Sequence, residues 1–456
     1  MSSTVDGLVS GMDTTSVINQ LMQVEAATQT RLKAKISTAQ TAVSSYQSVN
    51  SKLSALKSAA DSLGQLSTWR GIKASSTSST VTATALTGTN GNAGTTTFDV
   101  ARLAKNQITT AKVDTSADIT SEGQISITIG SGDPVDIALT DKTADGVAKA
   151  INAAGIGVKA TVITTGGSSN IIQFSGTKTG AANSFTVTGL DNLGSSLTNV
   201  TEAQDARLDI GGGDANEQGG GYSVTSSTNT FTTLMPGVSI TATKEGETNV
   251  TVQAVADVDG IADKFQALVD AANATLTEIG AQTAYDAGTK TGQPLTGDFT
   301  VRQMSQTILG SISHGLTYDD PDWVKPEDDP DAVAPKKTFP TLSAIGIELD
   351  STGKLTFNRS AFKSAYADDA SKIQEVGIAF GNEYETMAGS MSTNVSSVIT
   401  GRKSEIDTIN NQISAWDVRL TARRAALQKQ YSNLEVALGK LKDQSNWLAG
   451  QLAGLS

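Results

Sequence analysis

The stretch GLVSGMDTTSVINQLMQVE, residues 7–25, places an amphipathic helix near the start of the chain. Asp13 or Thr14 can cap this helix, because their side-chain oxygens accept the free N–H groups of a first turn. Apolar and small residues then recur in steps of three and four as far as Leu63. Gly64 follows and suits the left-handed conformation that ends many helices. The first 63 residues therefore predict a long helix.

The last 55 residues carry a second long apolar stripe. Apolar residues recur in steps of three and four through residues 406–455, interrupted at Arg423 or Arg424 and at Gln444 or Ser445. Each terminal helix then covers about 45–50 residues, or roughly 70 Å at a rise of ~1.5 Å per residue. Two helices of similar length at opposite ends of one chain suggest that they pair with each other.

The apolar stripes are too long to be buried only against small domains. A stripe of this kind normally faces a core, but a long helix that projects from a domain keeps an uncovered face. We therefore predict that the two seams bind other chains. The predicted partner-binding residues are Ile18, Leu21, Met22, Leu32, Ile36, Val43, Leu53, Leu56, Ile413, Trp416, Leu420, Leu427, Leu434, Leu438, Leu441, Leu448 and Leu452.

The middle of the chain changes character twice. Residues 72–255 are rich in Thr, Ser, Gly and Val and show the period-2 alternation of strands, with one helix expected over 144–155. The helical period returns from Val258, and residues 344–358 predict a β-hairpin. Residues 317–337 form an acidic segment with four of the eight prolines, which makes regular structure there unexpected.

The expected fold is multidomain α+β. Long terminal helices form a coiled-coil stalk and a helical bundle, and β-rich domains are inserted between them. The predicted domains are a stalk segment (1–45 with 420–456), a helical bundle with a hairpin (46–75 with 257–419), a β-rich domain (76–105 with 195–256) and an inserted outer β-rich domain (106–194).

Composition narrows the classes of function. The chain has 34 basic and 46 acidic residues, a net charge of -12, which argues against general nucleic-acid binding. It has no cysteine, which excludes disulfides and Cys-ligated metals. The sequence has no run of 18 apolar residues, so it does not predict a membrane-spanning helix. The first residues, MSSTVDGLVS, lack the features of a cleaved secretory signal, so any export is expected by another route.

Three motifs are weighed and set aside. GIGVKA, residues 155–160, matches a dinucleotide fingerprint, but a helix precedes it and a strand follows, which is the reverse of the required order. DKTADG, residues 141–146, begins like a calcium loop but has Asn152 where a bidentate Glu is needed. His314 is the only histidine, and its neighbour Ser313 is badly placed for a proton relay. We predict no catalytic site, no metal and no cofactor.

Several stretches together resemble the flagellar hook-associated protein 2 family, the flagellar filament cap proteins. The opening stretch and the closing stretch LQKQYSNLEVALGKLKDQSNWLAGQL are similar to that family's two ends. The other similar stretches are AINAAGIGVKA (150–160), SSTNTFTTLMPGVSITAT (226–243), PLTGDFTVRQM (294–304) and AIGIELDSTGKLTF (344–357). They follow the family's order along most of the chain, although the acidic segment is not part of its pattern.

The resemblance implies a structural, non-enzymatic role. It implies a homo-oligomeric ring of roughly four to six copies at the tip of the filament, secreted and extracellular. Such a cap retains exported flagellin and promotes its polymerisation. The implied partners are flagellin, hook–filament junction proteins, the flagellar type III export apparatus and a cytosolic export chaperone. The polar interruptions at Arg423, Arg424, Gln444 and Ser445 are expected to keep the contacts of a moving cap weak.

Two alternatives remain open from the sequence. The chain could be another flagellar axial protein, either a junction protein or a flagellin-like subunit. It could instead be a surface adhesin whose β-rich domains mediate cell adhesion by binding glycans.

Overall fold

The structure, a computed structural model, describes residues 11, 13–86, 91–114, 116–165, 170–212, 220–329 and 331–453. The chain divides into two compact units. The helical unit comprises Met1–Gln65 and Ala262–Ser456, and the β unit comprises Leu66–Ile261. The predicted multidomain α+β class is confirmed, whereas the finer division into four domains stays a prediction.

The N-terminal helix is divided in two. Helix α1 spans Thr14–Glu25 and α2 spans Ala27–Gly64, with a break at Ala26, so the prediction of one continuous helix is wrong at that residue. The side chain of Asp13 accepts a hydrogen bond from the Ser16 N–H at 2.8 Å, which confirms Asp13 as the cap. No side chain caps the start of α2, so no capping hydrogen bond fixes the break between α1 and α2.

Gly64 has a different role from the one predicted. It is the last residue of α2 rather than a left-handed residue beyond it, because the chain leaves the helix through Gln65 in an extended conformation. A Cβ on Gly64 would lie 2.4 Å from the Asn382 side-chain oxygen. Gly64 therefore serves the close approach of two helices.

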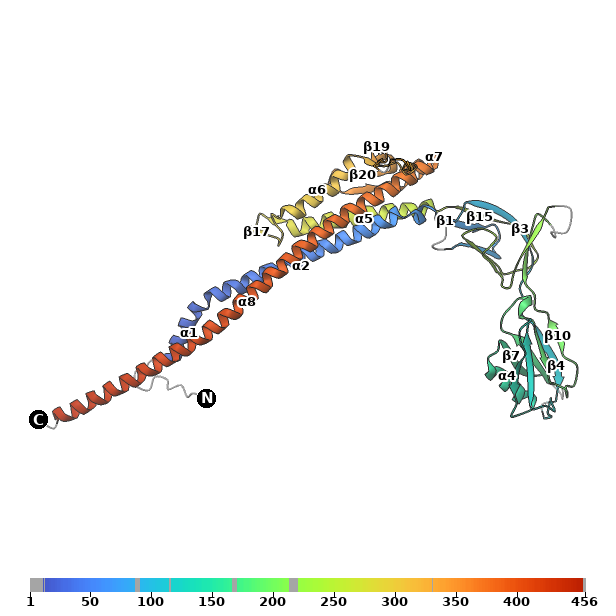
Figure 1. The fold of residues 1–456 in the computed structure, drawn as a ribbon, viewed down its shortest axis with the longest axis horizontal. Helices are drawn as coiled ribbons and strands as arrows, with labels where there is room; N and C mark the ends of the chain where they lie inside the picture. Colours follow the sequence, from blue (N-terminus) through green and yellow to red (C-terminus); the bar gives the residue numbers. More distant parts are fainter. Residues whose placement is uncertain are drawn as a thin grey trace. The chain divides into compact units, whose positions relative to one another are not determined.

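The C-terminal helix is longer than predicted. Helix α8 spans Ala370–Ala453, 84 residues, which corresponds to roughly 126 Å. It includes residues 370–405, where buried side chains such as Ile373, Val376 and Met391 hold it in the bundle. Helices α2 and α8 lie side by side, and α8 continues past the start of α1 (Figure 1).

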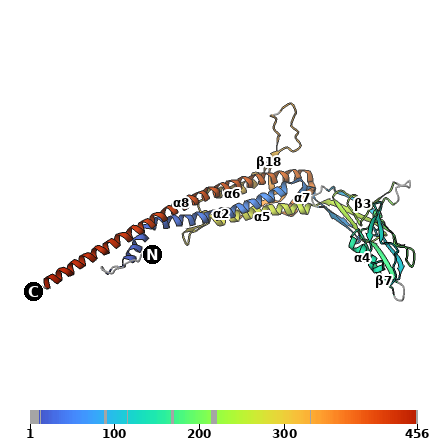
Figure 2. The same cartoon turned by 60° about the horizontal axis from the view of Figure 1, so that its bottom comes forward.

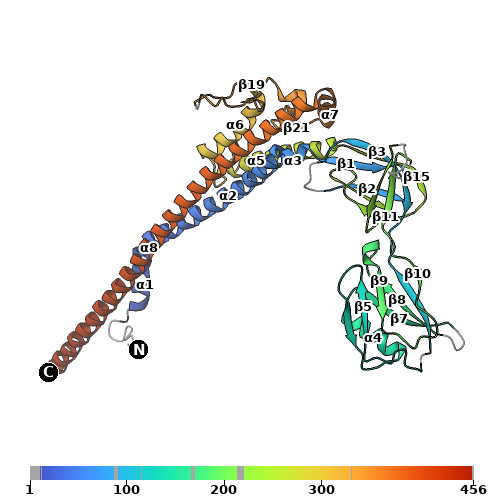
Figure 3. The same ribbon diagram turned by 45° about the vertical axis from the view of Figure 1, so that its right-hand side comes forward.

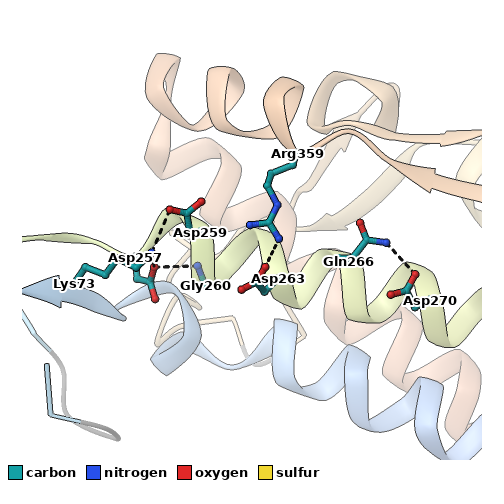
Figure 4. A network of polar contacts seen from close by, with 8 residues as sticks. All are labelled: Lys73, Asp257, Asp259, Gly260, Asp263, Gln266, Asp270 and Arg359. Atoms are coloured by element: carbon teal, nitrogen blue, oxygen red, sulfur yellow. Dashed lines mark hydrogen bonds and ion pairs between the residues drawn. The ribbon is translucent and has the colours of Figure 1, made fainter.

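Aromatic side chains form the core of the helical unit. Phe265 comes from α5 (Val258–Thr283) and lies 4.9 Å, between ring centroids, from Phe362 of α7 (Arg359–Asp368). Phe380 of α8 lies 4.5 Å from Tyr384. At the surface of this core, Arg359 donates to Asp263 of α5 (Figure 4).

Helix α6 (Phe299–Ser313) is fastened to α2 through its cap. Asp298 accepts the Val301 N–H at 3.0 Å with one carboxylate oxygen, and its other oxygen accepts the Tyr46 hydroxyl. Burial, together with the Asp298 carboxylate, raises the pKa of Tyr46 to about 12. The neutral phenol is therefore a stabilising feature of this junction.

Alkaline pH is expected to weaken the helical unit through Tyr46. Because its folded pKa lies above an unfolded value of about 10, its contribution is fully present below pH 10 and is lost as pH rises through 12. The loss amounts to about 2 kcal/mol. Urea unfolding between pH 9.5 and 12 should fall more steeply for the natural chain than for Tyr46→Phe. Parallel curves would contradict this assignment.

Three short hairpins complete the helical unit. Their strands are β16 (Tyr285–Asp286) with β17 (Thr291–Gly292), β18 (Leu316–Asp319) with β19 (Lys336–Phe339), and β20 (Ile347–Leu349) with β21 (Leu355–Phe357), which follows the 3-10 turn η2 (Leu342–Ile345). The last pair confirms the hairpin predicted within residues 344–358.

The acidic segment 317–337 is more ordered at its ends than predicted. Strands β18 and β19 pair there, and Lys337 bridges Asp320 at 2.9 Å and Glu375 of α8 at 2.8 Å. These carboxylates, Glu375 foremost, raise the pKa of Lys337. Between the two strands the segment stands away from α8 (Figure 2). The prolines therefore predicted the lack of regular structure in the middle of the segment, but not the two strands at its ends.

The β unit consists of antiparallel sheets with one main helix. The strands predicted from residue alternation are confirmed, and α4 (Ala144–Ala154) lies beside β7 (Figure 3). The unit begins with the single helical turn α3 (Leu66–Trp69). One sheet has the order β1 (Ile72–Ser76), β15 (Glu247–Ala256), β3 (Gly94–Arg102), β11 (Ala206–Ile210), β12 (Tyr222–Ser226); a second has β13 (Thr230–Phe231), β14 (Val238–Ala242), β2 (Val81–Ala85).

Two further sheets belong to the inserted part of this unit. One has the order β10 (Thr198–Thr201), β4 (Ile108–Val113), β8 (Asn170–Gly176), β7 (Val158–Thr164); the other has β6 (Val135–Ala138), β5 (Gln124–Ile129), β9 (Phe185–Thr188), and the 3-10 turn η1 (Ala181–Asn183) precedes β9. Phe174, Val147 and Ile125 are buried in one core, and Phe98, Val252 and Leu208 in another. The β unit therefore has two separate hydrophobic cores.

Two glycine-containing segments of the β unit, GIGVKA and residues 209–223, connect regular elements. Gly155 and Gly157 take positive φ angles of 64° and 91°, so GIGVKA is a turn from helix α4 into strand β7, as predicted. The two ends of the glycine-rich stretch 209–223 pair as strands β11 and β12. Residues 213–219 lie outside the described residues.

Capping interactions account for the charged residues beside α4 and α5. Thr143 caps α4 and is held in turn by the Asp141 carboxylate, which accepts both its N–H and its hydroxyl. Asp257 accepts the Gly260 N–H at 3.0 Å at the start of α5, and Lys73 pairs with Asp257 (Figure 4). These carboxylates therefore have structural roles.

Candidate partner-binding surface

The last turns of α8 carry an uncovered apolar seam. Leu434, Leu441, Leu448 and Leu452 expose 44%, 60%, 55% and 62% of their surface, and Leu438 is half-buried. With Tyr431 and Ser445, these residues recur in alternating steps of three and four, which is the repeat of a coiled-coil seam. We call the exposed leucines of residues 431–452, with Tyr431, Leu438 and Ser445 between them, the free seam of α8; Glu435, in the same stretch but off the seam, is buried.

The chain covers the preceding part of α8 with its own N-terminal helices. Gln29 of α2 donates to the Asp417 carboxylate at 2.5 Å. Arg423 pairs with Glu25 at 3.3 Å, and Arg424 donates to the Asn19 side-chain oxygen at 2.5 Å. Both arginines, which interrupt the apolar stripe, thus bind the N-terminal helices. The free seam starts just beyond these contacts.

The structure separates the predicted seam residues into three groups. Val43, Leu53, Leu56, Ile18 and Leu427 are buried within the chain. Met22, Leu32, Ile36, Ile413, Trp416 and Leu420 are half-buried along the pairing of the N-terminal helices with α8, and Leu438 is half-buried within the free seam. Leu21, Leu434, Leu441, Leu448 and Leu452 are exposed. Their role in binding partners stays a prediction, and the exposed group is the part available to another molecule.

Sequence reasoning overlooked four exposed apolar residues. These are Val24, Val418, Val436 and Trp447, each more than half exposed. Val418, Val436 and Trp447 lie off the seam defined by steps of three and four, so its periodicity does not include them, whereas Val24 follows the seam residue Leu21 by three. A second, weaker stripe on the same helices would have been the signal.

Few charges flank the free seam. The positions beside its leucines are Gln430, Ala437, Gln444, Ala449 and Gln451, with Glu435 and Lys442 as the only charged ones. Charged residues at such positions normally set the choice and direction of a partner helix. This seam can therefore attract a helix by apolar contact with little selection by charge.

The described residues offer little for chemistry. They contain no group of three or more His, Asp or Glu side chains arranged to hold a metal ion. His314 ends α6 at the surface, where its Nδ1 contacts the Gly310 carbonyl. Among the described helices, none is long and apolar enough to cross a membrane.

Comparisons with known proteins identify the family. The model of the flagellar hook-associated protein 2 C-terminus matches residues 203–443, and that of its N-terminus matches residues 10–107. The chain belongs to the flagellar hook-associated protein 2 family. The resemblance found in the sequence is thereby confirmed, and the first model extends into the free seam.

Similar proteins agree with this family. Flagellar hook-associated protein 2 of Escherichia coli (strain K12) is 25% identical over 98% of this chain and 97% of its own length. The lateral flagellar hook-associated protein 2 of Vibrio parahaemolyticus is 26% identical over 58% of each chain. The crystal structure of the D1-D2-D3 domains of the Escherichia coli flagellar cap protein FliD has a similar fold, with a TM-score of 0.59 and 22% identity over 80% of this chain and 99% of that chain.

These matches decide between the readings left open by the sequence. This family member is a cap protein of the bacterial flagellar filament, found outside the cell at the filament tip. The matches do not favour a junction protein or a flagellin-like subunit. They give no support to a role in cell adhesion.

Proposed function

We propose that this chain caps the filament as a homo-oligomer and retains exported flagellin through the free seam of α8. The observation that carries the proposal is the seam itself. Its heptad spacing continues from the part of α8 that α1 covers, and Leu434, Leu441, Leu448 and Leu452 expose between 44% and 62% of their surface. Large apolar side chains in such a row mark a surface that binds another molecule.

The spacing of the seam favours an α-helix as its occupant. Residues 431–452 extend over roughly 33 Å at ~1.5 Å per residue, which matches a partner helix of about 20 residues. Anchors at steps of three and four are the pattern by which one amphipathic helix binds another. We infer that the partner is a helix of a flagellin subunit arriving at the tip.

A cap must release each subunit and move as the filament grows. Strong, charge-selected pairing would oppose this movement, whereas a seam flanked by Gln and Ala allows the partner helix to shift or be exchanged. Ser445 in the middle of the seam lowers its affinity further. The composition of the seam thus fits repeated, individually weak contacts.

The remaining parts of the proposal rest on the family. We infer a ring of identical chains, contact with hook–filament junction proteins, and export through the flagellar type III apparatus with a cytosolic chaperone. We also propose a structural rather than a catalytic role. The feature that supports it is the row of leucines on α8, whose side chains can bind another chain but carry no reactive group.

The pair Leu441→Asp and Leu448→Asp tests the seam in cells that lack the natural cap gene. At about 2 kcal/mol of apolar burial lost per leucine, flagellin binding should weaken at least a hundredfold. Filaments should then fail to grow, and monomeric flagellin should accumulate in the medium. The measurement is the ratio of soluble to filamentous flagellin, with the amount of exported cap protein determined in parallel.

The matched control places two aspartates on the opposite side of the same helix. Ser432→Asp and Asn446→Asp add the same charge at exposed positions away from the leucines. This control should support normal filaments. Normal growth with the leucine variant, or equal loss with both variants at equal export, would refute a role for the seam in retaining flagellin.

A further inference from the structure

Helix α1 has a second apolar face beside the face that it buries against the chain. Its inner face buries Thr14 and Ile18 against the chain. Val17, Leu21 and Val24 are spaced at i, i+4 and i+7, and Leu21 and Val24 expose 42% and 76% of their surface. This spacing puts the three side chains on one stripe, which is a common form of helix-binding surface. We call it the outer face of α1.

Helix α8 also has an apolar face on its far side. Val418 is 71% exposed, and Ala415, Ala422 and Ala425 continue its stripe in steps of three and four. This stripe lies opposite the side chains of Ile413 and Leu420, which α8 turns toward the N-terminal helices. We call it the far face of α8.

The two faces overlap in level along the paired helices, where residues 21–24 of α1 meet the level of residues 422–425 of α8. The Gln29–Asp417 and Asn19–Arg424 contacts fix the antiparallel register of the N-terminal helices against α8. In this register Leu21 and Val24 lie near the level of Ala425 and Ala422, whereas Val418 lies near the level of Gln29 at the start of α2. One pair of helices therefore presents two different apolar faces, on different sides, whose levels overlap over about one helical turn.

That arrangement suits a ring of identical chains. In a closed cyclic ring, each contact joins different surfaces of neighbouring copies, and the two surfaces must lie at the same height along the symmetry axis. The outer face of α1 and the far face of α8 are different surfaces, and they share a height where residues 21–24 and 422–425 overlap. Large side chains on α1 facing alanines on α8 also allow two helices to approach closely.

Charge at one end of the two faces is complementary. Asp13 precedes the outer face of α1 by four residues, and Lys429 follows Ala425 of the far face by four. Asp13 lies six residues before Asn19 and Lys429 five residues after Arg424, so the Asn19–Arg424 contact puts them at nearly the same level. Both are exposed. A neighbouring copy would bring these opposite charges together.

We propose that the outer face of α1 binds the far face of α8 in a second copy of this chain, and that this contact closes the ring. The inference rests on the self-assembly in the proposed function and identifies the surfaces through which the copies contact each other. The occupant is the second copy because the chain itself supplies the complementary face at the matching height.

A disulfide trap tests the contact in the full chain. The natural sequence has no cysteine, so Leu21→Cys with Ala422→Cys introduces a single possible pair. Within one copy these positions lie on different helices and point apart, more than about 10 Å from each other, whereas a disulfide needs Cα atoms within about 7 Å. Mild oxidation should therefore join separate copies into a ladder on non-reducing gels. The top rung of the ladder gives the number of copies in the ring.

Gln23→Cys with Ala422→Cys is the matched control, because Gln23 is an exposed residue of α1 outside its apolar stripe. It should give less than about a tenth of the crosslinked product at equal oxidation. Leu21→Asp should raise the dissociation constant of the oligomer roughly tenfold or more. Light scattering on the same samples gives the oligomeric state independently of crosslinking.

Each outcome has one meaning. Oligomers that form without the ladder, or with equal ladders in both variants, would overturn this contact while leaving the proposed self-assembly intact. A natural chain that stays monomeric at every concentration would overturn both. An intact helical signal in circular dichroism confirms that the variants are folded, since both positions lie at the surface.

Discussion

Replacing Gly381 with valine is expected to destabilise the helical unit by about 3 kcal/mol or more. A Cβ at this position would lie 2.5 Å from the backbone nitrogen of Gly64 and 2.8 Å from the carbonyl oxygen of Ala60. Both are backbone atoms of α2, so no flexible side chain can move aside. The helices would have to separate, and the buried Leu56 and Leu63 would lose contacts.

Gly401→Val is the matched control for this prediction. Gly401 belongs to the same helix, but nothing lies within 4 Å of a Cβ placed on it. Its replacement should leave stability almost unchanged, since glycine is a poor residue within a helix. Urea unfolding followed by circular dichroism at 222 nm reports mainly on the helical unit. Equal midpoints for the two variants would show that α2 and α8 tolerate separation at Gly381.

The same glycine explains why the length of α8 was underestimated. Residues 370–405 include Gly377, Gly381, Gly389 and Gly401, which lower local helix propensity. In the folded chain, Gly381 permits the close approach of α2, so tertiary packing compensates for the low propensity. That compensation depends on residues more than 300 positions away, and a local pattern cannot reveal it.

The seams were predictable as helices but not as surfaces. Steps of three and four identified Val43, Leu53 and Leu441 alike. Which of them is buried depends on the register between α2 and α8, which the Gln29–Asp417 contact reveals. Val43 and Leu53 lie where α2 packs against α8 and are buried, whereas Leu441 lies beyond the level of α1 and is exposed. Periodicity alone cannot distinguish the buried residues of a stripe from the exposed ones.

The strands of the β unit were the most predictable elements. Stretches such as residues 124–130 and 248–255 alternate apolar and polar side chains because one sheet face packs on a core. Loop lengths were less predictable. At the acidic segment, the pairing of Lys337 with Asp320 and Glu375 outweighs the effect of nearby prolines, and Glu375 is distant in sequence.

Phe265→Ala is expected to cost the helical unit about 3–5 kcal/mol. Phe265 is fully buried, and its ring lies 4.9 Å from Phe362, 5.6 Å from Phe357 and 6.4 Å from Phe380, measured between centroids. These partners come from α7, β21 and α8, so the side chain joins four separate segments. Truncation would remove its burial and leave a cavity that rigid neighbours cannot fill.

Phe299→Ala provides the comparison for Phe265→Ala within the same unit. Phe299 is 75% exposed at the start of α6, so its truncation should change the free energy of unfolding by less than about 0.5 kcal/mol. The β unit has its own cores, and Phe265 is in neither of them. In the Phe265→Ala variant, hydrogen exchange should therefore show that the strands of the β unit unfold at the same midpoint as in the natural chain. The helical signal of this variant should be lost at a lower denaturant concentration. Equal effects of the two substitutions would mean that the aromatic cluster does not hold the bundle together.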